Sequence, residues 1–414
     1  MGYKPGQKQF SPLSGIDEEV IMEAIYLDHS ATTPTDPEVL GAMMRYFANH
    51  FGNPSSVHRF GQEAKRAVDE ARGQVAALIG ADPEEIVFTG GGTEADNMAL
   101  MGTAFAETSG RNHIITSAIE HHAVLNTCKY LETKGFAVTY LPVDDQGIVS
   151  PEDVKRAMTG KTFLISIMHA NNEIGTIEPL SEIAFMARER GVIVHTDAVQ
   201  SVGKIPVNVN DLGVNLLSLA GHKLYGPKGT GALYVRRNTP IRPILFGGHQ
   251  EGGRRTGTEN VPGIVGLGKA CEIAARDLPG QMDRMLGLRK RLEQQIMEKI
   301  ADVRVNGNPF RSLPHILSVS FRSIAGDAIV RELDKQAIAA SAGAACTADT
   351  IRLSHVLEAM QIPKDIAKGT VRFSLGKGNT EAQIDYAAGV LPEIVNKLRG
   401  MAELEASVGT RGCR

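Results

Sequence analysis

The stretch SLAGHKLYGPKGTGALYV, residues 218–235, decides the fold of this chain, and Lys223 stands at its centre. Two apolar runs enclose a turn with glycines at 221, 226, 229 and 231, where the backbone can pass close to a bulky planar ligand. The Lys223 amine can hold an aldehyde as a Schiff base if it is partly desolvated and lies near an acidic group and a phosphate cradle. The alternative is a solvated lysine in a glycine-rich hairpin, because most lysines lie at the surface.

Composition excludes several classes of protein. The 414 residues include 44 Lys and Arg against 47 Asp and Glu, a net charge of -3 that offers no positive surface for nucleic acid. No apolar run approaches the roughly 20 residues of a membrane span, and the first residues lack the apolar core of a secretory signal. Four widely spaced cysteines form neither a disulfide framework nor a metal motif. We therefore expect a cytoplasmic protein with no direct nucleic-acid binding, no membrane association and no metal.

Short apolar runs alternate with helical patterns between residues 85 and 235. Strands that are apolar on both faces and joined by helices are typical of an α/β fold with a mostly parallel sheet. Ligands bind beyond the carboxyl ends of such strands, so the loops that follow these runs are the expected place for a site. The predicted strands are EIVFTG (85–90), HIITSA (113–118), AVTYLPV (137–143), TFLISIMHA (162–170), GVIVHTDA (191–198), LLSLAG (216–221) and GALYV (231–235).

The pattern changes after residue 264. A second, α+β unit with a small sheet is predicted there. Its predicted elements are a long helix at 266–301, strands at 303–305, 315–321 and 370–375, and a helix near 327–336. We therefore predict a large domain at 26–264 that binds the ligand, and a small domain formed by 1–25 and 265–414.

A glycine-rich turn follows the first predicted strand of the large domain. Gly90, Gly91 and Gly92 precede Thr93 and a helix that begins near Glu94. Free amide groups and the positive end of a helix suit a phosphate. The spacing matches neither a Walker loop nor a dinucleotide signature, and a plain tight turn is the alternative.

Polar residues also follow other predicted strands. Asp197 comes after a buried strand, where a carboxylate is unfavourable unless a pyridinium N–H or a structural salt bridge supplies a positive partner. His121 and His122 are adjacent and cannot both chelate one metal ion from a helix. His121 can stack on a flat ring, transfer protons or cap a helix. Asn172 can donate to a phenolic oxygen or take part in a local turn.

Several runs together resemble one protein family. They are YLDHSATTP, FGNPSSVH, TGGGTEADN, TSAIEHHAVL, MHANNEIGT, HTDAVQSVGK, GHKLYGPKGTGALYV, GGHQEGGRRTGTENV, SAGAACT and VRFSLG, and they follow the family's order from residue 26 to residue 376. The chain is similar to the cysteine desulfurases of the NifS/IscS type, in the class V aminotransferase group of fold-type I pyridoxal phosphate enzymes. The resemblance implies that fold, pyridoxal 5'-phosphate as the cofactor and L-cysteine as the substrate.

The resemblance also implies which residues hold the cofactor ring. Lys223 would form the Schiff base, and Asp197 would pair with the pyridine nitrogen. Asn172 and Gln200 would contact the phenolic oxygen. His121 would stack on the ring and assist proton transfers.

The phosphate would be held by Gly92, Thr93 and His222, joined by Thr258 of a second subunit, which implies a homodimer. One position departs from the family. This chain has Ala220 where the family usually places a serine on the phosphate. One hydrogen bond to the phosphate is then missing, a loss of about 1.5–3 kcal/mol unless another group replaces it.

Two further positions would contact the substrate. Arg372 would clamp its carboxylate, a task that suits a planar guanidinium, and Asn53 is a second candidate. Cys346 lies among small residues, AASAGAACTADT, and this composition predicts a mobile loop that brings the thiol to the substrate. The alternative is a buried cysteine that packs as a small hydrophobe, as we expect for Cys128 and Cys271.

The implied activity removes sulfur from L-cysteine, giving L-alanine and a persulfide on Cys346. Sulfur held on a loop can pass to an acceptor protein, such as a scaffold for iron-sulfur clusters or an enzyme that thiolates tRNA. A selenocysteine lyase or another class V enzyme is the nearest alternative. A sulfur-delivery scaffold without catalytic activity is a more distant one.

Overall fold

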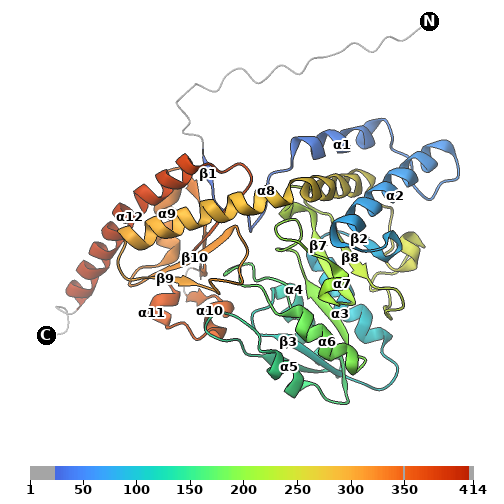
Figure 1. The fold of residues 1–414 in the computed structure, drawn as a ribbon, viewed down its shortest axis with the longest axis horizontal. Helices are drawn as coiled ribbons and strands as arrows, with labels where there is room; N and C mark the ends of the chain where they lie inside the picture. The colour runs from blue at the N-terminus through green and yellow to red at the C-terminus, as the bar shows by residue number, and fades with distance from the viewer. Residues whose placement is uncertain (1–23, 348–349, 410–414) are drawn as a thin grey trace, which may run out of the picture.

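The computed structural model describes residues 24–347 and 350–409 (Figure 1). Its larger sheet has seven strands in the order β2-β8-β7-β6-β5-β3-β4. β8 is antiparallel to both of its neighbours, and the other pairs are parallel. All the predicted strands are present, as β2 (Ile86–Thr89), β3 (His113–Ser117), β4 (Ala137–Leu141), β5 (Thr162–Ser166), β6 (Ile193–Asp197), β7 (Leu216–Ala220) and β8 (Gly231–Val235).

Helices cover both faces of this sheet, as Figure 1 shows. They are α1 (Pro37–Ala48), α2 (Arg59–Ile79), α3 (Gly92–Ala106), α4 (His122–Glu132), α5 (Pro151–Ala157), α6 (Leu180–Glu189) and α7 (Val209–Leu212). Successive strand residues pack into opposite cores, because side chains alternate along a strand. Leu217 belongs to the core beneath α2 and α6, whereas Leu216 belongs to the core beneath α3 and α4.

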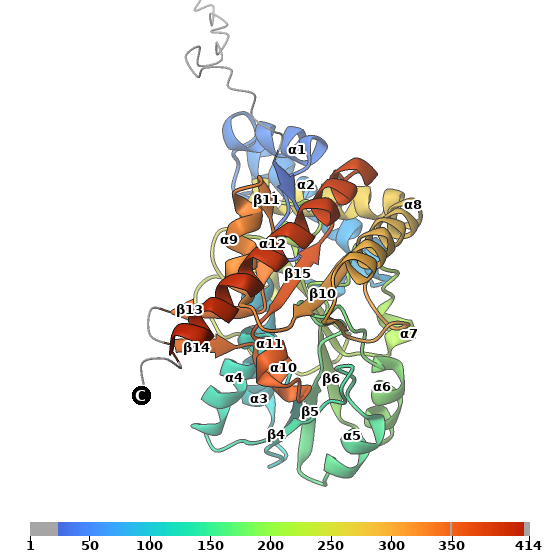
Figure 2. The same ribbon diagram turned by 90° about the vertical axis from the view of Figure 1, so that its left-hand side faces the viewer.

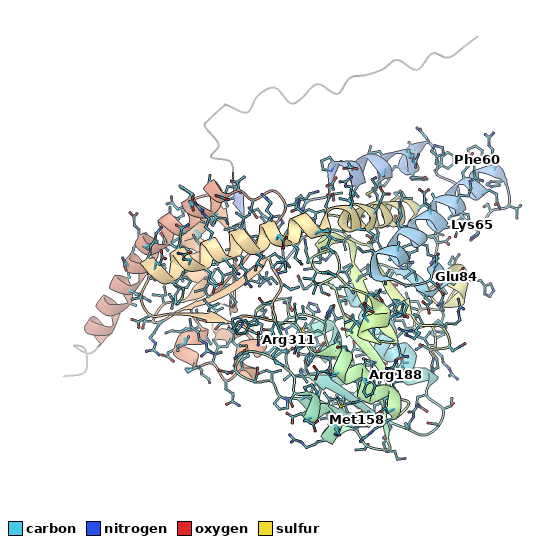
Figure 3. The ribbon with its side chains drawn as sticks, in the orientation of Figure 1. Phe60, Lys65, Glu84, Met158, Arg188 and Arg311 are labelled. Atoms are coloured by element: carbon cyan, nitrogen blue, oxygen red, sulfur yellow. The ribbon has the colours of Figure 1, made fainter. Side chains whose placement is uncertain are left out.

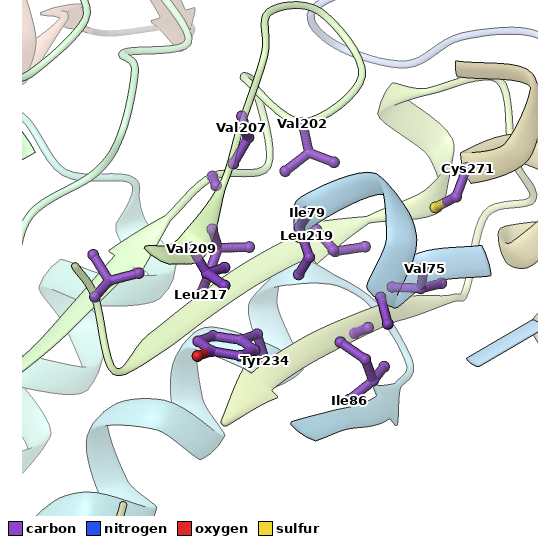
Figure 4. Packing of buried hydrophobic residues seen from close by; sticks show 14 of the residues in the cluster. Val75, Ile79, Ile86, Val202, Val207, Val209, Leu217, Leu219, Tyr234 and Cys271 are labelled. Carbon is purple, nitrogen blue, oxygen red and sulfur yellow. The ribbon is translucent and has the colours of Figure 1, made fainter. Parts of the chain in front are cut away.

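Helix α2 shows why the sequence pattern predicts a buried face. Ala64, Val68, Ala71 and Val75 recur every three or four positions, and all are buried. Figure 4 shows Val75 and Ile79 of α2 in one cluster with Leu217, Leu219 and Tyr234 of the sheet. The next predicted core position, Leu78, is half-buried, and Ile79 is buried in its place. The helix ends at Gly80, whose φ of 69° suits glycine.

The second unit has a four-stranded antiparallel sheet in the order β12-β15-β10-β9. Its strands are β9 (Val303–Asn306), β10 (Ile316–Phe321), β12 (Ser341–Ala342) and β15 (Thr370–Ser374). Figure 2 shows α12 (Glu381–Gly409) and part of α8 (Val261–Lys299) packed against this sheet. The remaining elements are β1 (Ile25–Tyr26), β11 (Ile338–Ala339), β13 (Ala344–Thr347), β14 (Thr350–Leu353), α9 (Gly326–Asp334), α10 (His355–Ala359), α11 (Lys364–Ala367) and short 3-10 turns at Pro83–Glu85, Gly221–Lys223 and Gln250–Gly253.

Helix α8 joins the two units as one continuous element of 39 residues. Leu267 and Cys271 pack into the core of the large sheet, whereas Leu288 and Leu292 pack into the core of the small one. The predicted boundary between residues 264 and 265 falls inside this helix, and the division into domains stays a prediction. The expected burial of Cys128 and Cys271 is confirmed. Within 24–347 and 350–409, no helix combines the length and the apolar character needed to cross a bilayer.

The close packing of α8 on α2 gives a stability prediction. A Cβ atom at Gly268 would lie 2.6 Å from Cα of Ala71, so Gly268→Ala must push the two helices apart. We expect the free energy of unfolding to fall by about 1–3 kcal/mol. The matched control is Gly287→Ala in the same helix, where a Cβ has no atom within 4 Å, and we expect a gain of about 0.5–1 kcal/mol. Urea midpoints that shift in the same direction for both variants would contradict this packing.

Candidate functional site

One cavity of about 280 Å³ lies beyond the carboxyl ends of the parallel strands, where the fold class predicts a ligand site. The structure brings most of the predicted site residues together at its wall. They are Gly92, Thr93, His121, Asn172, Asp197, Gln200, His222, Lys223 and Arg372. The wall also contains residues that the sequence did not single out, namely Ser30, Ala31, Asp96, Met168, Ala170 and Val199.

Lys223 lies on the 3-10 turn that follows β7. Its Nζ atom donates to the backbone oxygen of Ala31 at 2.8 Å and to that of Ser30. Burial lowers the pKa of Lys223 to about 8, and the nearby Arg372 cation acts in the same direction. The Lys223 side chain is therefore a partly desolvated amine that carries a neutral fraction near physiological pH, and the solvated alternative is excluded.

Asp197 ends β6 and faces the same cavity. Its Oδ1 atom accepts a hydrogen bond of 2.9 Å from the Val199 amide. Burial raises its pKa, while His121 and Lys223 act in the opposite direction. In the described part of the chain no Lys or Arg forms an ion pair with this carboxylate, so the structural salt bridge is not present. Asp197 is thus a buried anion that can receive a cationic ligand.

The start of α3 forms the phosphate-sized end of the cavity. Gly91 precedes the helix with a φ of 150°, a conformation that favours glycine, and no side chain caps the first amides. A Cβ at Gly92 would lie 2.7 Å from Cγ2 of Val199, so only glycine keeps this wall open. Burial lowers the pKa of His222 to about 4, which leaves its ring neutral beside Thr32. Neutral donors and free helical amides are suited to an anion.

His121 caps a helix, which is one of the roles that its sequence position allowed, and it also lines the cavity. Its ring lines the cavity, and its Nδ1 atom accepts a hydrogen bond of 3.1 Å from the Ala123 amide as the cap of α4. Because the amide donates to Nδ1, Nε2 is the ring nitrogen left to face a ligand. Gln200 also lines the wall, and its Nε2 atom donates to the Ser30 oxygen at 3.0 Å.

The two neighbouring asparagines have different roles. Asn171 forms the local turn, because its Oδ1 atom accepts from the amides of Glu173 and Ile174 at 2.8 and 3.1 Å. Asn172 instead lines the cavity, and its backbone oxygen accepts from Arg372 at 2.9 Å. The sequence left both roles open for Asn172, a local turn or a place in the cavity.

Arg372 reaches the cavity from β15 of the small unit. Its guanidinium donates to Oδ1 of Asp28 at 2.8 Å, while its Nε atom is buried without a hydrogen-bond partner. An arginine fixed on one side by a carboxylate, with a free donor on the other, can bind a further anion. The sequence analysis missed Asp28, although it lies in the motif YLDHSATTP.

Three predicted site residues are not seen at the Lys223 cavity. Two of them do not line it, and the side chain of the third lies outside the described residues. Asn53 is exposed and forms a local turn with the Ser55 amide at 3.0 Å, beside a separate cavity whose wall includes Lys65 and Glu84. Figure 3 places Lys65 and Glu84 at the outer edge of the large unit. Thr258 is exposed on the loop before α8 and does not line the Lys223 cavity of the single chain. Both positions are those in a single chain. The substrate role of Asn53 and the phosphate role of Thr258 in a second subunit stay predictions.

The backbone of Cys346 lies in β13, where it pairs with Ile351 of β14, and its side chain is outside the described residues. The predicted loop is therefore a strand pair, because regular hydrogen bonds are compatible with its small residues. A second cavity, of about 780 Å³, has Gly343 and Leu353 at the base of this pair. It shares Asn172 and Arg372 with the Lys223 cavity.

The pKa of Lys223 gives a direct prediction. In the cofactor-free protein, acetylation of its amine followed by peptide mass spectrometry should reach half of its maximal rate near pH 8. A free lysine reaches this point near about pH 10.4, since only the neutral amine reacts. Arg372→Gln should raise the midpoint, because the arginine cation lowers the pKa of Lys223. A midpoint at the ordinary lysine value would contradict the burial of this amine.

Comparisons with known proteins agree with this geometry. The family model for aminotransferase class-V matches residues 25–387. A cysteine desulfurase IscS of Dictyoglomus turgidum is 49% identical over 91% of this chain and 95% of its own length. A cysteine desulfurase of Trichormus azollae is 51% identical over 92% of this chain and 95% of its own. A solved NifS-like protein superposes with a TM-score of 0.86 at 41% identity, covering 91% of this chain and all of that one. The chain belongs to the aminotransferase class-V family.

Proposed function

We propose that this protein is a cysteine desulfurase, which uses pyridoxal 5'-phosphate to remove sulfur from L-cysteine. The products are L-alanine and a persulfide on Cys346. The observation that carries the proposal is the cavity in which Lys223, Asp197 and Arg372 meet. Relatives named cysteine desulfurase match about nine-tenths of the chain, and a solved relative, SspA in complex with cysteine, has a TM-score of 0.76 at 39% identity over 85% of this chain and 98% of its own.

The residues present fit the cofactor. Asp197 is buried without a cationic partner, which a protonated pyridine nitrogen supplies. The open amides at Gly92 and Thr93 suit the phosphate, and Lys223 supplies the amine. When bound, pyridoxal 5'-phosphate supplies an electron-withdrawing ring that accepts the charge left when a proton is removed from the substrate Cα.

The chain's own groups account for binding and proton transfer. Arg372, whose orientation is fixed by Asp28, lines the cavity and would hold the substrate carboxylate. Lys223 takes the proton from Cα and later returns it, a role for which a pKa of about 8 is well matched. Asp197 would supply the negative charge that pairs with a protonated ring nitrogen. His121, whose Nε2 atom is left free by the Ala123 amide, would move protons at the ring.

Cys346 completes the reaction as a nucleophile. Its thiolate attacks the substrate sulfur, so an S–S bond forms while the substrate Cβ–S bond breaks. The electron pair leaves with the carbon fragment, which is protonated to L-alanine. The second cavity supports this route, because it extends from the base of the β13–β14 pair to Asn172 and Arg372.

The proposal also includes a second subunit, a sulfur-acceptor protein and a cellular location. Thr258 is exposed in the single chain and is free to reach the phosphate of a second subunit, so the active form is a homodimer. Sulfur on Cys346 is then passed to an acceptor protein such as an iron-sulfur cluster scaffold. We also propose a cytoplasmic location, because free cysteines such as Cys128 and Cys271 are typical of a reducing compartment.

The proposal predicts equal amounts of sulfide and alanine from L-cysteine with a reductant. Lys223→Ala should reduce turnover by about 10²–10⁴-fold, because the proton-transfer group is lost. Cys346→Ala should abolish the protein-bound persulfide. Lys228→Ala, an exposed lysine on the same loop, is the matched control and should retain activity. Full sulfide release by Cys346→Ala would contradict the mechanism, and turnover of selenocysteine alone would instead identify a selenocysteine lyase.

A second prediction concerns Ala220, which lines the cavity and lies 3.6 Å from a Cβ placed on Gly92. Ala220→Ser adds a hydroxyl donor at the phosphate end. We expect the dissociation constant of pyridoxal 5'-phosphate to fall roughly tenfold, for a hydrogen bond to a charged group of about 1.5 kcal/mol. Equilibrium dialysis measures the change, and Ala220→Gly is the control without a donor. An unchanged constant for Ala220→Ser would show that the phosphate does not lie beside this position.

A further inference from the structure

We propose that Asp96 is a neutral carboxylic acid that shares its proton with the Asp197 carboxylate and so acts as a positioning residue for it. The sequence resemblance assigned no role to Asp96. The inference deepens the proposed function, on which its consequence for the cofactor rests. Its test needs neither cofactor nor substrate.

Asp96 is placed by α3, the helix whose first residue is Gly92. Asp96 lies four positions after Gly92, so the two residues lie on the same face of the helix, one turn apart. The Asp96 side chain lines the cavity wall beside Asp197. Carboxylate oxygens of Asp96 and Asp197 and a ring nitrogen of His121 lie within 4.8 Å of one another. The helix that frames the phosphate end therefore also brings a second carboxyl group within 4.8 Å of Asp197.

The groups that face Asp96 do not neutralise a negative charge. Asp197 and His195 face it from β6, Ser218 from β7, and Glu120 and His121 from the segment between β3 and α4. Nε2 of His195 lies 3.6 Å from Oδ1 of Asp96, but burial lowers the pKa of His195 to about 3 and keeps its ring neutral. In the described ranges, no Lys or Arg forms an ion pair with Asp96.

The hydrogen bonds around Asp96 also favour a protonated side chain. Its Oδ1 atom is buried and accepts no hydrogen bond, which is unfavourable for an ionised carboxylate. Asp197, by contrast, accepts the Val199 amide and lies near Lys223. Burial and the Asp197 charge both raise the pKa of Asp96 well above its ordinary value, and they outweigh a side-chain hydrogen bond with Ser218 that acts in the opposite direction. Two carboxylates at such close range cannot both ionise, so one proton stays on the pair, and it stays on Asp96.

A shared proton has two consequences for the site. The pair carries a single negative charge, which matches the single positive charge of a protonated ring nitrogen. The Asp96 hydroxyl also holds Asp197 against α3, so the distance between the phosphate end and the ring-nitrogen end of the cavity is set by one helix. Ser218 and His195 support the arrangement from behind, where Nε2 of His195 lies 3.0 Å from Oγ of Ser218.

Infrared difference spectroscopy of the cofactor-free protein at neutral pH tests the protonation of Asp96. The C=O stretch of a protonated carboxyl group should be present in the wild type and lost in Asp96→Asn. Burial also raises the pKa of Glu120, to about 8, so this carboxyl group contributes a band of its own at neutral pH. Glu120→Gln is the control that identifies the Glu120 band and separates it from the Asp96 band. Asp197→Asn is a second variant that does not alter Asp96 itself. Without its charged neighbour, Asp96 should lose its proton at lower pH.

The acetylation midpoint of Lys223 gives an independent readout. Asparagine is a neutral isostere of a protonated aspartic acid, so Asp96→Asn should leave the midpoint where it is. Asp197→Asn should lower it, because the Asp197 charge raises the pKa of Lys223. If Asp96→Asn lowers the midpoint as Asp197→Asn does, and removes no protonated carboxyl band, then Asp96 is ionised and the inference is wrong. If the infrared band and the acetylation midpoint both behave as expected but the protein has no desulfurase activity, only the proposed function is overturned.

Discussion

The site depends on one constraint, the buried carboxylate of Asp197 at the carboxyl end of β6, which forms no ion pair with a Lys or Arg among the described residues. Burial disfavours the charged forms of Asp197 and of Lys223, which share the cavity wall, and it shifts their pKa values in opposite directions. The pKa of Lys223 is thereby brought to about 8, within the range in which protons move at physiological pH. A positively charged planar ligand would relieve the unfavourable burial of Asp197, and this is the physical reason that the cavity suits a pyridinium.

The cavity needs both units of the fold. The large sheet supplies Lys223 and Asp197, while β15 of the small unit supplies Arg372. The short segment after β1 connects them, because β1 pairs with β11 of the small unit and the next residues reach the cavity. Asp28 holds Arg372, and the oxygens of Ser30 and Ala31 hold the lysine amine. A few residues near the start of the described chain thus orient both cations of the site.

The two adjoining cavities separate two tasks. The smaller one, around Lys223, is lined by groups suited to anion binding and proton transfer, whereas the larger one leads to the base of the β13–β14 strand pair that carries Cys346. Their shared wall, Asn172 and Arg372, is where a substrate carboxylate and a sulfur atom would meet. Under the proposed function, this arrangement would keep the thiol on a different element from the base, so that sulfur could leave the site without disturbing Lys223.

The sequence by itself determined the seven strands of the large sheet and three of the four strands of the small one, because periodicity depends on neighbours along the chain. Most of the cavity wall was predicted from the resemblance of its motifs to a known family. Only the tertiary structure decided the environment of the side chains. It paired Arg372 with Asp28, 344 residues away, placed Asp96 behind Asp197, and gave Asn171 the turn and Asn172 the cavity. Burial and electrostatic neighbours are set by segments far apart in sequence, so no local pattern contains them.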